Sequence, residues 1–441
     1  MVTSKKSLNL IFIGFITLIL LLFFILTQKY NLLISFSLFL IPIAIVLIFF
    51  YPEIGLNLMI TEPLLYFILP ILPIAEGFKR AGIIIFVFLI LILTFFYSVY
   101  KKPQTINNLS YLIKEPIYLL LILIGVALFI SVLRLPFAFS EYGYVKFFSY
   151  LLLSLLPSFS LLFIKEDKKL KRFIYFLIFF LSLFFIYVLF KILREGLENV
   201  LENEIIPYRL GFSLSVVTFG RWAGIGVFSL FLLFFTEKNR LIKILSFILI
   251  PLFLYLLLLS GTRGAILALF VCLFIFFFLK IRNLKEKIIF VFLFIFLFFI
   301  FYSLLPTMIA ERLTYFEDES SINRIETISL AFKNFLDSPI LGKGLGSFPY
   351  YTYNFLYPHN IFAEFASETG FLGLIPFIIY ILLCFKKVFK KFQEKSLISL
   401  FPAFLFIYAF IHSQFSFDIG NNFLLFFAGA FLTLKGDNNE Q

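Results

Sequence analysis

A single histidine and a few arginines are the residues of this sequence that suit chemistry on a phosphate-bearing substrate. His359 lies in the motif Pro358-His-Asn360, and it is one of only two histidines in 441 residues. Proline favours the first turn of a helix, and the positive end of a helix dipole disfavours a charged imidazole. The motif therefore predicts a neutral His359 that can accept a proton from a hydroxyl group. A histidine that only caps the helix or packs on tyrosines is the simpler alternative.

The candidate arginines lie near the ends of apolar segments, where a cation can meet a substrate held in a membrane. Arg263 follows a tight turn, and Arg324 opens an amphipathic run from Asn323 to Asp337. Arg209 and Arg221 fall in a predicted loop between two apolar segments. A guanidinium group fits phosphate in a bidentate manner, so the set predicts a site for a lipid-linked diphosphate. An arginine at a membrane edge can also simply extend its head group into water.

Local patterns predict how these residues are held. Asn323 and Glu326 have the form of a capping box, which makes Asn323 the N-cap of a helix that runs to Asp337. The next helical pattern ends at Gly370, because glycine suits the C-terminal cap. Three glycines in the segment 342–346 predict a tight turn, since no strand–turn–helix pattern surrounds them to indicate nucleotide binding.

The flanking sequence indicates a membrane protein. It is 62% hydrophobic and 14% charged, which is more apolar surface than a soluble chain of this length buries. Pro63, Pro70 and Pro73 interrupt the third apolar segment, which predicts a broken or re-entrant helix there. The sequence predicts an all-α polytopic transmembrane bundle of about 12–14 spans. The segments lie near residues 8–27, 31–50, 55–75, 81–100, 116–133, 147–164, 173–193, 222–236, 241–259, 264–279, 288–305, 370–385, 396–412 and 419–434.

Charge predicts the topology and the division of the chain. Lysine clusters fall in alternate loops, which places these loops and both termini inside the cell. A large loop at 306–369, containing short helices, then lies outside, between a bundle at 1–305 and further spans at 370–434 that precede a tail at 435–441. The net charge of +12 indicates topology rather than nucleic-acid binding. With only two histidines, the sequence predicts no histidine-based metal site.

An ordered set of short motifs resembles the O-antigen ligase and polymerase family. Members of this family are polytopic inner-membrane proteins with a large periplasmic loop before the last spans. The resemblance covers roughly residues 260–377 in sequence, and the whole chain in layout. The motifs are Thr262-Arg-Gly-Ala265, Ser338-Pro-Ile-Leu-Gly342, Gly344-x-Gly346-x-Phe348, Pro358-His-Asn360 and Glu368-x-Gly370-x-x-Gly373.

The resemblance implies transfer of a glycan from undecaprenyl diphosphate to a hydroxyl of lipid A–core, a step of lipopolysaccharide biosynthesis that needs no cofactor. It implies that His359, Arg263 and Arg324 are catalytic, with His359 as the base and with inversion at the anomeric carbon. The family often has an asparagine-containing turn where this chain has Gly220-Arg-Trp-Ala223. This leaves open whether Arg209 or Arg221 binds the diphosphate. The residues expected to bind substrate are Arg209, Arg221, Asn360, Tyr357 and Glu368.

Two other functions compete with ligation. A polymerase of the same family would use the same donor and extend a growing glycan. A transporter or flippase of lipid-linked oligosaccharide belongs to another class, and would need charged groups along a path through the membrane. In each case the expected partners are a lipid-linked glycan and membrane lipid, without nucleic acid.

Overall fold

The protein is helical throughout the residues that its computed structural model describes. These residues are 46–61, 85, 87–94, 96, 114–134, 141–164, 167–195, 216–280, 283–303, 319–352, 355–394 and 396–434. Every regular element assigned in them is a helix, which confirms the predicted all-α class. The chain divides into two compact units, Met1–Pro103 and Gln104–Gln441. The candidate site residues all belong to the second unit.

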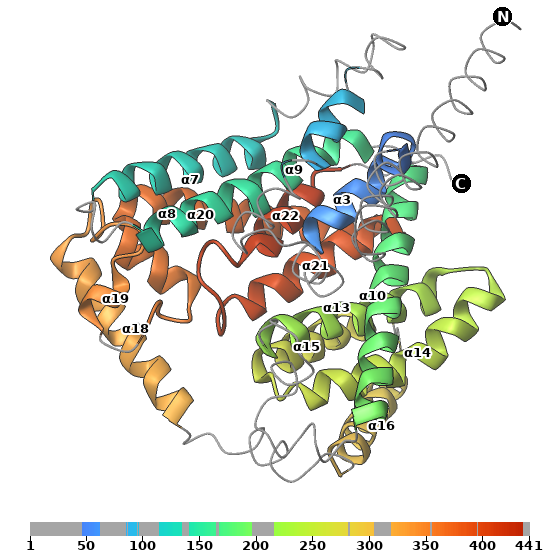
Figure 1. The fold of residues 1–441 in the computed structure, drawn as a ribbon. Coiled ribbons are helices and arrows are strands. Elements are labelled where there is room, and N and C mark those ends of the chain that lie inside the picture. Colours follow the sequence, from blue (N-terminus) through green and yellow to red (C-terminus); the bar gives the residue numbers. More distant parts are fainter. Residues whose placement is uncertain are drawn as a thin grey trace, which may run out of the picture. The chain divides into compact units, whose positions relative to one another are not determined.

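The helices that position the site lie in the second unit (Figure 1). The first unit includes α3, Pro52–Ile60. The second unit contains α7 (Pro116–Leu133), α8 (Glu141–Ser149), a π-helical turn (Tyr150–Leu155), α9 (Leu156–Ser160), a 3-10 turn (Leu161–Ile164), α10 (Asp167–Glu195), α13 (Val216–Thr236), α14 (Arg240–Leu259), α15 (Arg263–Lys280), α16 (Leu284–Ser303), α18 (Glu319–Asp337), α19 (Phe348–Tyr351), α20 (Ile361–Glu394), α21 (Leu397–His412) and α22 (Phe423–Phe431).

Several of these helices are membrane spans by length and composition. Within the described residues, five are long and apolar enough to cross a bilayer: α7, α10 over Asp167–Phe190, α13, α14 and α20. Shorter apolar helices occur in α15 and α21. The chain is therefore a multi-pass membrane protein, as predicted. The predicted spans near 8–27, 31–50, 55–75 and 81–100 lie at least half outside the described residues, so the total remains a prediction.

The predicted span at 147–164 lies within a continuous helical segment whose helix type changes along its length. The structure has α8, a π-helical turn and α9 here, followed by a 3-10 turn. In the π-helical turn the amide of Leu156 donates to the carbonyl of Leu151, five residues back. Pro157 comes next and has no amide hydrogen to continue an ordinary ladder. The predicted final span at 419–434 contains only the short α22, and residues 432–434 follow it as a turn.

Helix α20 is two helices that meet at a break. Gly370 has φ 60° and ψ −157°, so its first part ends where the sequence predicts. The break leaves the carbonyls of Ser367 and Glu368 without their helical donors. The tight turn predicted at residues 342–346, which we call the glycine turn, supplies other donors. The amides of its Lys343 and Gly344 donate to these carbonyls at 2.8 and 3.0 Å. The glycine turn therefore replaces the hydrogen bonds that the break removes.

The glycine turn fits the break because neither backbone carries a side chain there. A Cβ at Gly370 would lie 2.5 Å from the amide nitrogen of Gly342, and one at Gly342 would lie 2.4 Å from the carbonyl carbon of Glu368. Both glycines also have positive φ angles. In the other direction, the amides of Phe371 and Leu372 donate to the backbone carbonyls of residues 339 and 340, at 2.7 and 3.0 Å. The two segments thus form one rigid junction.

Candidate active site

The turn between α21 and α22, residues 413–422, contacts several of the segments that carry candidate site residues. We call it the 413–422 turn. The carboxylate of Asp418 stabilises it by accepting hydrogen bonds from the amide of Asn421 at 2.7 Å and from its side chain at 2.9 Å. Phe417 adopts a φ of 68°, which is unusual for a residue with a side chain. No motif in the sequence pointed to this turn.

His359 lies beside the 413–422 turn, just before α20. Asn360 is the N-cap, because its Oδ1 accepts from the amide of Ala363 at 3.0 Å. Its Nδ2 donates to the Gln414 side chain at 3.2 Å, and the amide of Ile361 donates to the Ser413 carbonyl at 3.2 Å. The expectation that Pro358 occupies the first helical turn is therefore wrong, since asparagine provides the stronger cap. His359 itself has a φ of 55°, a strained conformation of the kind found at functional sites.

The imidazole of His359 is neutral at neutral pH, as predicted, although for a different reason. Burial, and then the nearby Arg324 guanidinium, lowers the pKa of His359 from its usual 6.5 to about 4. The ring of Tyr357 packs on the histidine with 4.4 Å between ring centroids. Burial also raises the pKa of the Tyr357 hydroxyl well above its ordinary value, as do the charges of Asp418 and Glu364. The two rings therefore form a partly dry surface at the start of α20.

Arg324 reaches this site from α18. The hydroxyl of Thr327 donates to the carbonyls of Arg324 and Pro358, at 3.0 and 3.4 Å, and so joins α18 to the residue before His359. The predicted N-cap at Asn323 is wrong, because α18 begins at Glu319. The predicted end at Asp337 is confirmed.

Arg221 lies inside α13, which corrects the prediction of a loop at this position. It is 3% exposed, its Nη1 donates to the carbonyl of Asn421 at 2.9 Å, and its guanidinium lies 4.1 Å from the ring centroid of Phe417. Helix α13 extends this far because Gly220 allows close packing: a Cβ there would lie 1.9 Å from Thr262 Oγ1. The 413–422 turn thus holds the Arg221 cation in a fixed position.

Arg263 begins α15 beside the same turn. The neighbouring Gly264 packs on Phe415, where an added Cβ would lie 3.1 Å from the Phe415 Cβ. The Gly220–Thr262 contact also brings the Arg263 turn next to the α13 segment that carries Arg221. Segments bearing Arg221, Arg263 and His359 therefore contact one turn. Arg209 lies outside the described residues.

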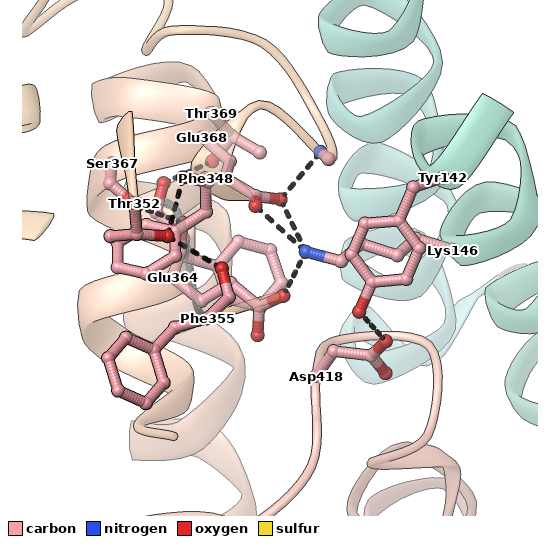
Figure 2. Close-up of polar contacts among 12 residues, drawn as sticks. Tyr142, Lys146, Phe348, Thr352, Phe355, Glu364, Ser367, Glu368, Thr369 and Asp418 are labelled. Carbon is pink, nitrogen blue, oxygen red and sulfur yellow. Dashed lines mark hydrogen bonds and ion pairs between the residues drawn. The ribbon is translucent and has the colours of Figure 1, made fainter. Parts of the chain in front are cut away.

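A buried charged cluster also contacts the 413–422 turn (Figure 2). Lys146 Nζ donates to Glu364 Oε1 at 2.6 Å and to Glu368 Oε1 at 2.8 Å, and all three side chains have no exposed surface. Glu368 Oε2 accepts from the amide of Gly346 at 2.9 Å. The Tyr142 hydroxyl donates to Asp418 Oδ2 at 2.8 Å. The cluster therefore connects α8, α20 and the glycine turn with the 413–422 turn.

Of the residues in this cluster, the sequence pointed only to Glu368, as a residue expected to bind substrate. The available signal was the spacing of Glu364 and Glu368, because residues four apart on a helix share a face and can meet one cation. Glu368 is completely buried, so no substrate reaches it in this conformation.

The aromatic side chains just before α20 differ in exposure. Phe348 is completely buried, whereas Tyr350 is 62% exposed; Tyr353 lies outside the described residues. Among the described residues, no three His, Cys, Asp or Glu side chains are grouped so as to hold a metal ion.

Comparison with known families agrees with the motifs. Residues 248–378 match the family model described as O-antigen ligase. The match includes Arg263, Arg324 and His359, and it ends before the 413–422 turn. No curated protein matches the chain.

Proposed function

Because the chain carries an O-antigen ligase domain at residues 248–378, we propose that it transfers a glycan from undecaprenyl diphosphate to a hydroxyl group of lipid A–core. The reaction takes place at the periplasmic face of the inner membrane, with both termini in the cytoplasm. The observation that carries the proposal is the meeting of the Arg221, Arg263 and His359 segments at the 413–422 turn.

The arginines stabilise the diphosphate as it leaves. Cations that are already oriented stabilise developing charge best, because they need not reorganise during the reaction. Arg221 is oriented by Asn421 and Phe417, which supports this role. Arg263 and Arg324 supply the other cations of the site. Arg209 remains a candidate for the same ligand, and a variant comparison separates it from Arg221.

His359 is the general base. It removes the proton of the acceptor hydroxyl, whose oxygen attacks the anomeric carbon as the bond from that carbon to the diphosphate oxygen breaks. The proton remains on the imidazole, the diphosphate leaves with the electron pair, and the configuration inverts. The neutral form of His359 predominates at neutral pH, as this role requires.

The remaining candidates position these groups. Asn360 caps α20 and binds Gln414, so it fixes the backbone beside His359. Tyr357 packs on the imidazole and lines the acceptor side. Glu368 acts indirectly, through Lys146 and the glycine turn. A polymerase would use the same arrangement and differ only in the acceptor.

The test is reconstitution of the full chain in proteoliposomes with undecaprenyl-diphosphate-linked glycan and lipid A–core. We expect glycosylated lipid A–core and free undecaprenyl diphosphate in equal amounts. Longer lipid-linked glycans as the product would identify a polymerase. Movement of the donor across the bilayer, with no new glycosidic bond, would identify a transporter and overturn the proposal.

A further inference from the structure

Helix α18 has an apolar face that no other described part of the protein covers. Its side chains recur at intervals of three and four residues, which places them on one side of the helix. The opposite side is buried, with Thr327, Ala331 and Asn334 at most 3% exposed. The open side chains are 41–73% exposed, and they are Ile325, Ile328, Phe332 and Leu336. We call these four residues the α18 stripe.

The α18 stripe continues into a surface that faces lipid. Beyond its break, α20 is a membrane span, and it exposes Phe371, Ile375 and Leu382 on one side. The rings of Phe335 and Phe371 lie edge to face, 5.1 Å apart, where α18 ends and this span begins. Ile340, which is 70% exposed, lies between the two surfaces, and its carbonyl accepts a hydrogen bond from the amide of Leu372. One apolar surface therefore runs from the membrane span along α18.

The edge of the α18 stripe has the polarity of a membrane interface. Lys333 and Glu326 are exposed beside it and, with Ile325, line a shallow hollow of about 420 Å³. Lys343 Nζ lies 5.4 Å from the centre of the Tyr351 ring, near the end of α18. Lysine and tyrosine are favoured at the level of lipid head groups, because each combines an apolar body with a polar tip. A helix with such faces is typical of one that lies in the interface plane.

We propose that α18 lies in the outer head-group region of the bilayer, with the α18 stripe on the acyl chains. Arg324 directly precedes Ile325, so this placement holds its guanidinium at the depth where a lipid presents its phosphates. The bilayer is the occupant, because the stripe is continuous with a membrane span. The link to Arg324 rests on the proposed function, whereas the placement of α18 does not.

The test measures the depth of two neighbouring positions in the full chain. Phe332→Cys and the control Lys333→Cys are labelled with an NBD fluorophore and reconstituted in phosphatidylethanolamine–phosphatidylglycerol vesicles. The native Cys272 and Cys384 are buried and do not compete for the label. We expect spin-labelled lipid to quench position 332 more strongly than position 333, and aqueous iodide to do the reverse. Equal iodide quenching at both positions would overturn the proposal. Position 332 shielded from both quenchers would also overturn it, because a protein or a second copy would then cover the stripe.

A second measurement tests the link to the site. The double variant Phe332→Ser and Leu336→Ser should raise KM for a bilayer-embedded donor, and leave turnover unchanged with a short-chain donor in detergent. An equal loss of transfer activity with both donors would exclude the link to Arg324. Because the fluorescence experiment needs no activity, its result stands even if the reaction proves to be different.

Discussion

Lys146 of α8 and Glu364 of α20 form a completely buried ion pair, with 2.6 Å between Nζ and Oε1 across 218 residues of sequence. The same ammonium binds Glu368, so two carboxylates share one cation. A buried charge is stable only when it is paired and hydrogen-bonded. Among the described residues Glu364 Oε2 has no hydrogen-bond partner, whereas Glu368 also accepts from Gly346. The two glutamates therefore contribute unequally to the stability of the protein.

Removing the cation should destabilise the protein strongly. Lys146→Met leaves two buried carboxylates without their partner, and we expect a loss of about 3–5 kcal/mol. The matched control is Lys343→Met, which removes the more exposed pair with Asp337 and should cost about 0–1 kcal/mol. The measurement is the unfolding midpoint of each purified variant in detergent. Equal shifts for both lysines would contradict this account of the cluster.

The two glutamates should differ when each is neutralised. Glu364→Gln retains an oxygen for Lys146 and removes a charge whose second oxygen has no hydrogen-bond partner in the described part of the chain, so stability should change little. Glu368→Gln weakens contacts to both Lys146 and Gly346 and should be the more damaging change. Unfolding midpoints compare the two variants directly. A larger drop in the unfolding midpoint for Glu364→Gln than for Glu368→Gln would contradict this prediction.

His359→Ala should nearly abolish transfer, because loss of a general base lowers a rate by about 10²–10⁴-fold. Membrane levels and donor binding should persist, since the arginines hold the donor. His412→Ala is the matched control: His412 is 1% exposed and packs between Tyr408 and Phe417. The assay is the initial transfer rate at equal protein levels. Normal turnover by the His359 variant would remove the imidazole from the mechanism.

The pH dependence of transfer should report the His359 pKa. A general base works when neutral, so the rate should fall only as pH drops toward about 4, where the imidazole becomes charged. Arg324→Ala removes one of the two causes of the lowered pKa. The acidic limb of its residual activity should therefore move to higher pH. An unchanged limb would indicate that Arg324 does not act on His359.

Arg263→Lys should lose most of its activity at normal membrane levels, because lysine keeps the charge but not the planar fork. Arg240→Lys serves as the control, since Arg240 is exposed at the start of α14. The measurement is kcat and KM for the lipid-linked donor. Near-normal values for Arg263→Lys would favour a simple membrane-edge arginine.

The pair Arg209→Lys and Arg221→Lys, assayed in the same way, identifies which of these two binds the diphosphate.

Membrane orientation can be checked by labelling introduced cysteines. Tyr350→Cys lies on an exposed part of the loop that we expect in the periplasm, and Ser396→Cys lies in an exposed turn that we expect in the cytoplasm. A membrane-impermeant thiol reagent added to intact spheroplasts should therefore modify the first and not the second. Modification of position 396 would reverse the topology and place the site on the wrong side for a periplasmic reaction.

Local signals in the sequence predicted where helices end better than where they begin. Helix α18 ends at Asp337 before Ser338-Pro339, and α20 breaks at Gly370, because proline and glycine act within a few residues. The three glycines of segment 342–346 form a turn with positive φ angles, as predicted. The low pKa of His359 was predicted in direction, but its causes, burial and Arg324, come from packing.

Long-range contacts were not predictable in the same way. Arg221 looked like a loop residue because its contacts, Asn421 and Phe417, lie about 200 positions further along the chain. The Lys146 ion pairs span a similar distance. No local pattern marked the 413–422 turn, since its function depends on which segments pack against it. One sequence therefore indicates the chemistry of the candidates but not the residues that hold them.

The position of the 413–422 turn has a consequence for biosynthesis. Residues bearing the candidate chemistry, from Arg221 to His359, emerge from the ribosome and enter the membrane before the turn that contacts their segments. Asn421 and Gln414 are made after these residues, and until then Arg221 and Asn360 lack their hydrogen bonds to the turn. A chain still being inserted would therefore hold its cations and its base unassembled. Activity would begin only after α21 and α22 are in place, so an incomplete chain could not consume donor.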